Sequence, residues 1–455
     1  MKETKFKQTE VGLIPSDWEV LPIKGLCTKV TDGSHESPKE VDNGYYMPSV
    51  KDMTDLGFCF FDCKQISKND YLKLERNGCR PEKDDVLIAK DGSILKYAFV
   101  MDDELPIVIL SSIAILRPNK KKIDSHYFAH YFKKEDFVNK VLSDYKTGTG
   151  VPRIVLNNFK EIEIAYPKKL EEQQRIANAL SDVDTLIANL EKLIVKKKNI
   201  KQGAMQQLLT GKKRLPGFGS DERRKECHSE RSAKREVEES SGYKMTELGL
   251  IPSDWEVKKL KTECTLITKG TTPSSLGFSV VSSGINFLKI EAIDKFGNLV
   301  KENLAYIDEL TNRALYRSQL QKNDLLISIA GALGRMFIVK DTVLPANINQ
   351  ALAIIRLKKD SLFDYKYVFY FLSSTQSQNI IKDLTVTGAQ PNISLDNVRN
   401  FWIASPSSKA EQTAIANVLS DMDTEISALE TKLAKYRTLK TGMMQQLLTG
   451  KIRLV

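Results

Sequence analysis

The side chains that could form a metal site are Cys59, Cys63, His126 and His130. His126 and His130 are four residues apart, which would place them on one face of a helix. Zinc sites, however, combine ligand pairs of the CxxC or HxxxH type at close range, and the second such pair is missing. The spacing therefore disfavours a metal site, and the six scattered cysteines are expected to be free thiols.

Known catalytic motifs are also absent from the sequence. A phosphate-binding loop needs GxxxxGK followed by Ser or Thr, but the residues after the two Gly-Lys pairs are Lys213 and Ile452. No GxSxG, HExxH or kinase motif occurs, nor an NPPY or DPPY tetrapeptide of the kind that holds a flipped adenine in a methyltransferase. None of the four histidines recurs between the two halves described below, which excludes a repeated histidine-based catalytic centre. The sequence therefore indicates a recognition protein and not an enzyme.

The charge points to a polyanionic partner, because the chain has a net charge of +10. Readers of duplex DNA place Lys and Arg on phosphates and present amide or guanidinium groups to base edges. We expect such residues on loops between strands, although each one taken singly could be an ordinary solvated loop residue. The candidates are Lys90, Ser93, Lys96, Lys146, Thr149 and Arg153 in the first half, and Arg335, Asn347, Asn349, Gln350, Gln390 and Asn392 in the second.

These loops belong to an internal repeat that spans nearly the whole chain. The phrase GLIPSDWEV occurs at residues 12–20 and again at 249–257. Further on, DDVLIAKDG at 84–92 matches NDLLISIAG at 323–331, and IANALSDVDT at 176–185 matches IANVLSDMDT at 415–424. The two halves therefore share a scaffold while their polar loop residues differ, as expected for two readers of different sequences.

Each half consists of a mixed body followed by a helical tail. Short apolar runs such as VLIA and AILR predict strands, and SHYFAHYFKKEDFVNKVL and DYKYVFYFLSSTQSQNIIKDL predict helices, so the fold class is expected to be α+β. Between the halves lies a charged stretch with almost no large apolar residue, which suits an exposed linker. The predicted parts are residues 1–168 (first body), 169–215 (first tail), 216–243 (linker), 244–407 (second body) and 408–455 (second tail).

The tails carry an apolar residue at alternating steps of four and three, the spacing of a coiled-coil seam. The seam residues are Ile176, Leu180, Val183, Ile187, Leu190 and Ile194 in the first tail, and Ile415, Leu419, Met422, Ile426, Leu429, Leu433 and Tyr436 in the second. Lys197 and Lys201 then occupy seam positions and loosen the first series. We expect the tails to pair, in parallel or antiparallel; alternatively, each helix docks separately on its own body. Gly211 and Gly450 are expected to end the helices.

The chain shows no sign of a membrane location. It contains no run of about eighteen apolar residues, and its first ten residues lack an apolar signal region. We therefore expect a cytoplasmic protein.

The duplicated GLIPSDWEV, the DDVLIAKDG and NDLLISIAG segments and the two copies of the QQLLTGK tail together resemble the specificity (S) subunits of type I restriction-modification systems. The resemblance covers the chain apart from the linker, which is long and charged for a join between conserved regions. It implies two target-recognition domains, each reading one half of a split site in double-stranded DNA. The helices would act as a ruler and dock two methyltransferase (M) subunits.

The same resemblance implies that the cofactors belong to the partners. The methyltransferase subunits would bring S-adenosylmethionine and methylate adenine, and restriction (R) subunits, where present, would add ATP and Mg²⁺. This chain itself would hold no cofactor. Two alternatives are a specificity subunit of another restriction-methylation type and a non-catalytic, two-domain DNA-binding repressor or scaffold.

Overall fold

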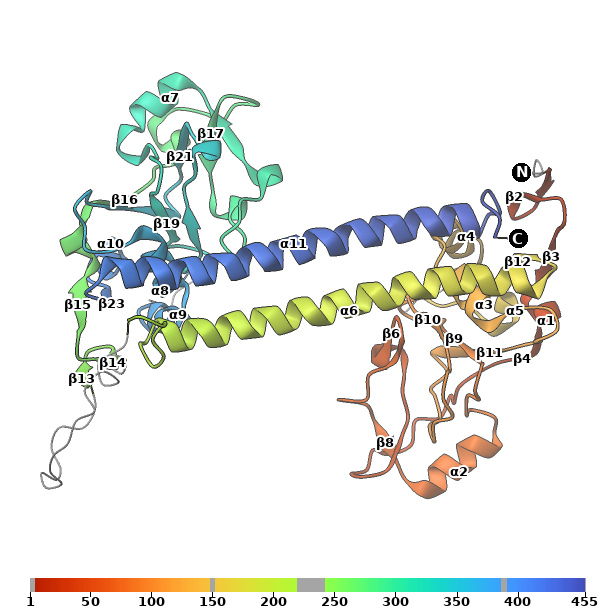
Figure 1. Cartoon of the computed structure of the whole chain (residues 1–455). Helices are drawn as coiled ribbons and strands as arrows, with labels where there is room; N and C mark the ends of the chain where they lie inside the picture. Colours follow the sequence, from red (N-terminus) through yellow and green to blue (C-terminus); the bar gives the residue numbers. More distant parts are fainter. Residues whose placement is uncertain (1–4, 148–151, 219–241, 386–390, 455) are drawn as a thin grey trace, which may run out of the picture. The chain divides into compact units, whose positions relative to one another are not determined.

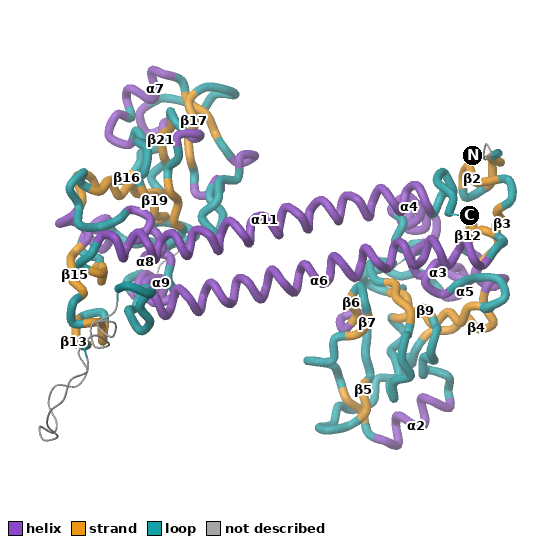
Figure 2. The backbone as a smooth tube through the Cα atoms, viewed as in Figure 1, coloured by secondary structure: helices purple, strands orange, loops and turns teal. Residues whose placement is uncertain are grey.

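The computed structural model describes residues 5–147, 152–218, 242–385 and 391–454, so most of the predicted linker lies outside it (Figure 1). The chain forms two compact units. Unit 1 comprises residues 1–192 and 430–455, and unit 2 comprises residues 193–429. Strands and helices alternate in both units (Figure 2), which confirms the predicted α+β class.

Unit 1 is built on a four-stranded antiparallel sheet with strand order β10-β9-β11-β4. The bounds are β4 (Cys27–Asp32), β9 (Val86–Ala89), β10 (Ala98–Val100) and β11 (Ile113–Pro118). Two-stranded pairs are β1 (Phe6–Thr9) with β2 (Gly12–Pro15), β3 (Trp18–Pro22) with β12 (Glu163–Pro167), β5 (Tyr45–Tyr46) with β8 (Gln65–Ile66), and β6 (Met53–Thr54) with β7 (Gly57–Phe58). The helices are α1 (Ile23–Leu26), α2 (Lys68–Arg76), α3 (Ser125–Tyr131), α4 (Glu135–Tyr145), α5 (Leu156–Glu161) and the first part of α6 (Leu170–Leu208).

Unit 2 repeats this plan with the antiparallel strand order β16-β22-β19-β20. These strands are β16 (Cys264–Lys269), β19 (Leu325–Ser328), β20 (Met336–Ile338) and β22 (Leu352–Leu357). The other strands are β13 (Tyr243–Thr246) with β14 (Gly249–Pro252), β15 (Trp255–Lys259) with β23 (Trp402–Pro406), and a small sheet of β17 (Ile285–Leu288), β18 (Ala305–Ile307) and β21 (Ala346–Ile348). The helices are α7 (Glu309–Ala314), α8 (Tyr365–Ser373), α9 (Thr375–Asp383), α10 (Leu395–Arg399) and α11 (Lys409–Leu447).

The central strands are apolar because both of their faces are covered. All four residues of β9, and all four of its counterpart β19, are buried. A buried ion pair joins neighbouring strands in each sheet: Arg117 donates to both oxygens of Asp85 at 2.9 Å, and Arg356 to both oxygens of Asp324 at 2.7 Å. A buried carboxylate needs such a partner, which explains the charged residues that recur beside these apolar runs.

The two long helices are antiparallel partners, which settles the orientation that the sequence left open. In unit 1, Lys440 of α11 contacts Asp184 of α6 at 2.5 Å, and Arg437 contacts Glu191 at 2.6 Å. The α11 numbers fall as the α6 numbers rise, as antiparallel packing requires. Unit 2 repeats the pattern, since Lys201 contacts Asp423 at 2.5 Å and Lys197 contacts Glu425 at 2.6 Å.

The lysines that interrupt the first seam are therefore paired with acidic residues of the other helix. Each helix also docks on its own body, because Ile176 and Leu180 join the core of unit 1 while Ile415 and Leu419 join that of unit 2. Both interpretations of the tails are thus partly right. All the other predicted seam residues are at least half-buried.

The end of each helix packs against the GLIPSDWEV phrase of the opposite half. Gly450 follows α11 in the left-handed conformation (φ +66°) and lies so close to Pro15 that a Cβ would collide with its ring and crowd Trp18. Gly211 (φ +69°) follows α6 and contacts Pro252 and Trp255 in the same way. Both glycines end their helices as predicted, and the shared phrase is the surface that receives the helix end.

Candidate nucleic-acid interface

In unit 1, four chain segments converge at one end of the four-stranded sheet. The turn after β9 meets the segment before β11, because Lys90 N donates to Ser112 O at 3.0 Å. The turn after β4 joins them, since Ser34 N donates to Ile109 O at 2.8 Å. Ile154 N donates to Lys90 O at 3.0 Å, which adds the segment between α4 and α5. Polar residues far apart in sequence are thereby collected at one edge.

Unit 2 builds the same edge from equivalent segments. Ile329 N donates to Ala351 O at 2.8 Å, and Gly270 N donates to Leu352 O at 3.2 Å. Ile393 N donates to Ile329 O at 3.0 Å, which brings in the segment before α10.

Glycine is required where the first of these turns crosses its neighbour. A Cβ on Gly33 would overlap the carbonyl oxygen of Ile109, and one on Gly270 would overlap that of Ile348. Both residues adopt ordinary backbone dihedrals, so space and not conformation imposes glycine. The sequence search did not single out these glycines, although their similar positions in the two halves were a usable signal.

The predicted residues of unit 1 lie in different environments. Lys90 is buried between Asp32 at 3.3 Å and Asp91 at 3.2 Å, so its charge is neutralised within the unit. Lys96, Lys146 and Arg153 are exposed, and Ser93 is half-buried. Arg153 forms backbone bridges with both Asp91 and Thr147, which fixes it beside the turn after β9. Thr149 lies outside the described residues.

The predicted residues of unit 2 divide in the same way. Asn347 is fully buried, and its amide donates to Asn312 Oδ1 at 3.0 Å and to Leu315 O at 3.1 Å. Arg335 is half-buried and donates from Nη1 to Ile293 O at 2.6 Å. These two side chains hold the unit together.

The remaining amides of unit 2 are closer to solvent. Gln350 and Asn392 are exposed, and Asn349 is half-buried, with its Oδ1 accepting from Ala351 N at 3.2 Å. Asn392 bridges to Ala330 in the turn after β19, as Arg153 does to Asp91 in unit 1. Gln390 lies outside the described residues.

Sequence reasoning missed a pair of positioning clusters at the helix ends. Arg453 contacts Asp17 of the first GLIPSDWEV phrase and Glu172 at the start of α6. Arg214 contacts Asp254 and Glu411 in the equivalent places. The same three residues, one arginine and two carboxylates, occur at matching positions of both halves. This recurrence was the signal in the sequence that could have revealed the clusters.

The residues considered for a metal site have other partners. His126 Nε2 lies 3.4 Å from Asp102, and His130 Nε2 lies 3.0 Å from the hydroxyl of Ser181. Within the described part of the chain, no group of three or more His, Cys, Asp or Glu side chains is placed to hold a metal ion. No described helix is long and apolar enough to cross a membrane.

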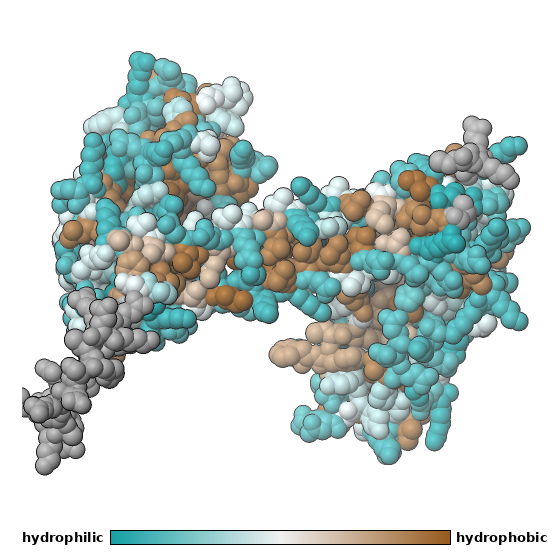
Figure 3. Space-filling view, in the orientation of Figure 1, coloured by the Kyte–Doolittle hydropathy of each residue, from teal (hydrophilic) through white to brown (hydrophobic). Residues whose placement is uncertain are grey.

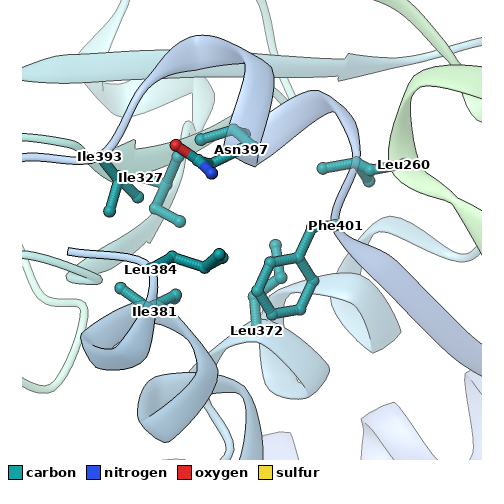
Figure 4. Close-up of a pocket in the computed structure, with 9 residues that line it drawn as sticks. Leu260, Ile327, Leu372, Ile381, Leu384, Ile393, Asn397 and Phe401 are labelled. Carbon is teal, nitrogen blue, oxygen red and sulfur yellow. The ribbon is translucent and has the colours of Figure 1, made fainter. Parts of the chain in front are cut away.

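Unit 2 also encloses a small apolar cavity beneath α10, with a volume of about 10 Å³. Figure 4 shows Ile327, Leu384 and Phe401 surrounding this space from different elements. Asn397 of α10 is the polar residue among those that line it.

The repeated architecture matches a known family. The model of the type I restriction modification DNA specificity domain matches residues 15–200 and again residues 252–435. The chain belongs to this family. Members of this specificity family are DNA-recognition subunits, and catalysis lies in partner subunits.

Individual members of the specificity family resemble the chain over its full length. The type I restriction enzyme MjaVIII specificity subunit of Methanocaldococcus jannaschii is 28% identical, with 99% of this chain and 97% of that protein aligned. The type I S subunit from M. genitalium has the same fold, with a TM-score of 0.59, 14% identity and 98% of both chains covered. A second chain, from a structure describing complex assembly and conformational transition of the type I R-M system, has a TM-score of 0.53 at 15% identity and covers 96% of this chain and 99% of its own.

Proposed function

We propose that each unit reads one half of a bipartite site in double-stranded DNA, and that the reading surface is the edge where the four segments converge. The observation that carries this proposal is that both units build this edge with the same backbone contacts but place different side chains on it. A common frame with different polar groups is what two readers of unlike sequences need.

The exposed residues at each edge have the chemistry for this task. Lys96, Lys146 and Arg153 can neutralise phosphates, and Arg153 can also donate two hydrogen bonds to guanine. In unit 2, the amides of Gln350 and Asn392 suit the adenine edge in the major groove. Lys90, Arg335 and Asn347 support these loops from inside, so we leave them out of the proposed contact set.

The proposal includes partners and a division of the chain. Residues 1–168 and 244–407 would be the recognition domains, and residues 169–215 and 408–455 the helices that set the spacer and dock two methyltransferase subunits. S-adenosylmethionine would enter with those subunits, and ATP and Mg²⁺ with restriction subunits. The DNA substrate makes the cytoplasm the proposed location.

Co-expression with the cognate methyltransferase subunit, followed by genome-wide mapping of methylated adenines, tests the proposal. We expect a new motif made of two short specific halves separated by an unspecific spacer. A repressor or scaffold would leave the methylation pattern unchanged, and that result would overturn the proposal. A motif with only one specific half would contradict the two-reader arrangement.

A further inference from the structure

The two-stranded hairpins at the head of the units, β1–β2 and β13–β14, repeat one sequence in one register. Residues 7–15 read KQTEVGLIP and residues 244–252 read KMTELGLIP. Lys7 pairs across the hairpin with Ile14, and Lys244 pairs with Ile251. The close similarity of the two halves, with seven of these nine residues identical, thus extends through an element that takes no part in the proposed DNA-reading edge.

Contacts within each unit explain most of these identical residues. Lys7 Nζ donates to Trp18 O at 2.6 Å, and Lys244 Nζ donates to Ser253 O at 3.0 Å. The hydroxyl of Thr9 donates to Gly12 O at 2.7 Å, and that of Thr246 donates to Gly249 O at 2.9 Å. Ile14 and Ile251 are each 3% exposed and join the hydrophobic cores.

Among the apolar residues of the repeated segment, the leucine is the exception. Leu13 is 57% exposed and Leu250 is 55% exposed, and neither belongs to a core cluster of the described residues. Their cross-strand neighbours, Gln8 and Met245, are exposed too. In the view of Figure 3 most of the visible surface of the two units is hydrophilic, with apolar residues confined to patches. One exposed leucine is ordinary, but the same leucine exposed at the same place in two diverged halves calls for an explanation.

We propose that Leu13 and Leu250 are the apolar anchors of two equivalent surfaces, each of which binds one copy of the methyltransferase subunit in addition to the helices that dock it. The inference rests on the proposed function. A partner that binds as two copies must find the same surface twice, whereas DNA-reading loops must differ between the units. Leu13 and Leu250 meet the first requirement in both side chain and position. Leu56 and Phe296 are also exposed, one in each unit, but their side chains differ, so they do not present the same surface twice.

Charge reversal of the surface, without change to the core, tests this assignment. We would prepare the full chain as Leu13→Arg, Leu250→Arg and the double variant, and measure bound copies of the methyltransferase subunit by native mass spectrometry and affinity by titration. Each single variant should bind one of the two copies at least about tenfold more weakly, and the double variant should lose both, because a charge buried at an interface has no partner. Leu310→Arg is the matched control, since Leu310 is 66% exposed on α7 and should leave both copies bound.

Two further measurements make every outcome decisive. Leu13→Gln and Leu250→Gln place an uncharged polar side chain at the same exposed positions, as Gln8 already does beside Leu13, so they keep the hairpins folded if arginine disturbs them. If the double variants of both kinds bind two copies with the affinity of the natural chain, the docking assignment is wrong while the proposed function stands. If the natural chain binds no methyltransferase and directs no methylation, the proposed function itself fails.

Discussion

At the residue scale, one arginine after each long helix joins an aspartate of the GLIPSDWEV phrase to a buried glutamate of the other long helix. Glu172 is 3% exposed and accepts from Arg453 at 2.5 Å and 2.8 Å. Asp17 accepts from the same guanidinium at 2.9 Å and 2.8 Å. The hydrogen bonds that Arg453 donates to Glu172 raise the pKa of Arg453, and those that it donates to Asp17 lower the pKa of Asp17. Arg453 and Asp17 therefore stay charged at neutral pH.

Removing this arginine should loosen unit 1. Arg453→Ala leaves Glu172 buried without a partner, which costs about 3–5 kcal/mol of unfolding free energy. Denaturant unfolding of Arg453→Ala, Glu172→Gln and the double variant measures the coupling, and the double variant should lose much less than the sum of the singles. Arg214→Ala is the matched change in unit 2. Strict additivity of the two single effects would refute a direct pair.

Another residue-scale prediction concerns acid sensitivity. Burial lowers the pKa of His130 to about 3, helped by Lys133 and Lys440, while Asp184 is 3.9 Å from Nδ1. The folded chain therefore keeps this ring neutral, whereas the unfolded chain protonates it near pH 6.5. Stability is fully present above pH 6.5 and falls as the pH drops toward 3, by at most about 1.4 kcal/mol per pH unit.

His130→Phe tests this prediction, because phenylalanine does not titrate and an aromatic ring, that of Tyr370, also occupies the matching position of α8 in unit 2. Unfolding curves at pH 7, 6 and 5 should show a smaller pH dependence for the variant than for the natural chain. An unchanged slope would mean that other groups cause the acid sensitivity.

The proposed reading edges make a separable prediction for each unit. Arg153→Ala should weaken recognition at one half-site, and Asn392→Ala should relax the other, each by about 1–3 kcal/mol if the side chain contacts a base. Methylation mapping of both variants against the natural chain resolves the two half-sites. Each variant is the control for the other, and equal losses at both half-sites would argue against independent readers.

At the element scale, the seating of α10 differs from that of its counterpart α5. Phe159 of α5 is fully buried and stacks on Phe132 with ring centroids 5.9 Å apart. The repeat places Val398 at the matching position of α10, where the cavity of about 10 Å³ remains. The backbone has the same course at both positions, but the valine side chain is smaller than phenylalanine. The space that phenylalanine fills in unit 1 therefore stays partly empty in unit 2.

Filling the cavity should raise stability only if the added volume is small. Val398→Ile adds one methyl group and should stabilise unit 2 by about 0.5–1 kcal/mol. Val398→Phe copies unit 1 but should cost about 1–3 kcal/mol, because Phe401 already replaces the smaller Ile162. Thermal unfolding of the two variants compares these effects. Stabilisation by Val398→Phe would show that the site can expand.

At the scale of the whole molecule, both long helices belong to both units. α6 contributes residues up to Lys192 to unit 1 and the rest to unit 2, while α11 passes from unit 2 to unit 1 after Leu429. Each helix has 39 residues, or about 58 Å at 1.5 Å per residue. Ion pairs between the two helices, Asp184 with Lys440 in unit 1 and Lys201 with Asp423 in unit 2, keep them in antiparallel register.

Lengthening both helices tests whether they set the spacer. One heptad inserted after Lys192 and another after Leu429 preserves the seam and adds about 10 Å, which corresponds to about three base pairs. Methylation mapping should show a spacer longer by that amount with unchanged half-sites. An insertion in α6 alone is the control and should destabilise the chain through mispairing. Unaltered spacing after the double insertion would rule out the ruler.

Much of this architecture follows from the sequence. Local sequence patterns and their repetition predict the duplication, the α+β class and the helical tails with their glycine ends. They also indicate membership of the specificity family. Such features depend on spacing and residue type along the chain, which a single sequence records directly.

Tertiary structure decided what depends on contacts between distant residues. The antiparallel direction of the helices follows from pairs such as Lys440 with Asp184, which no local pattern reveals. The folded chain also separated the exposed Arg153 from the buried Lys90 and Asn347, since burial depends on which segments meet at the sheet edge. The role of GLIPSDWEV changed for the same reason. In unit 1 its Asp17 and Trp18 receive the end of α11, because folding brings Arg453 Nη1 to within 2.9 Å of Asp17 although the two residues are 436 positions apart.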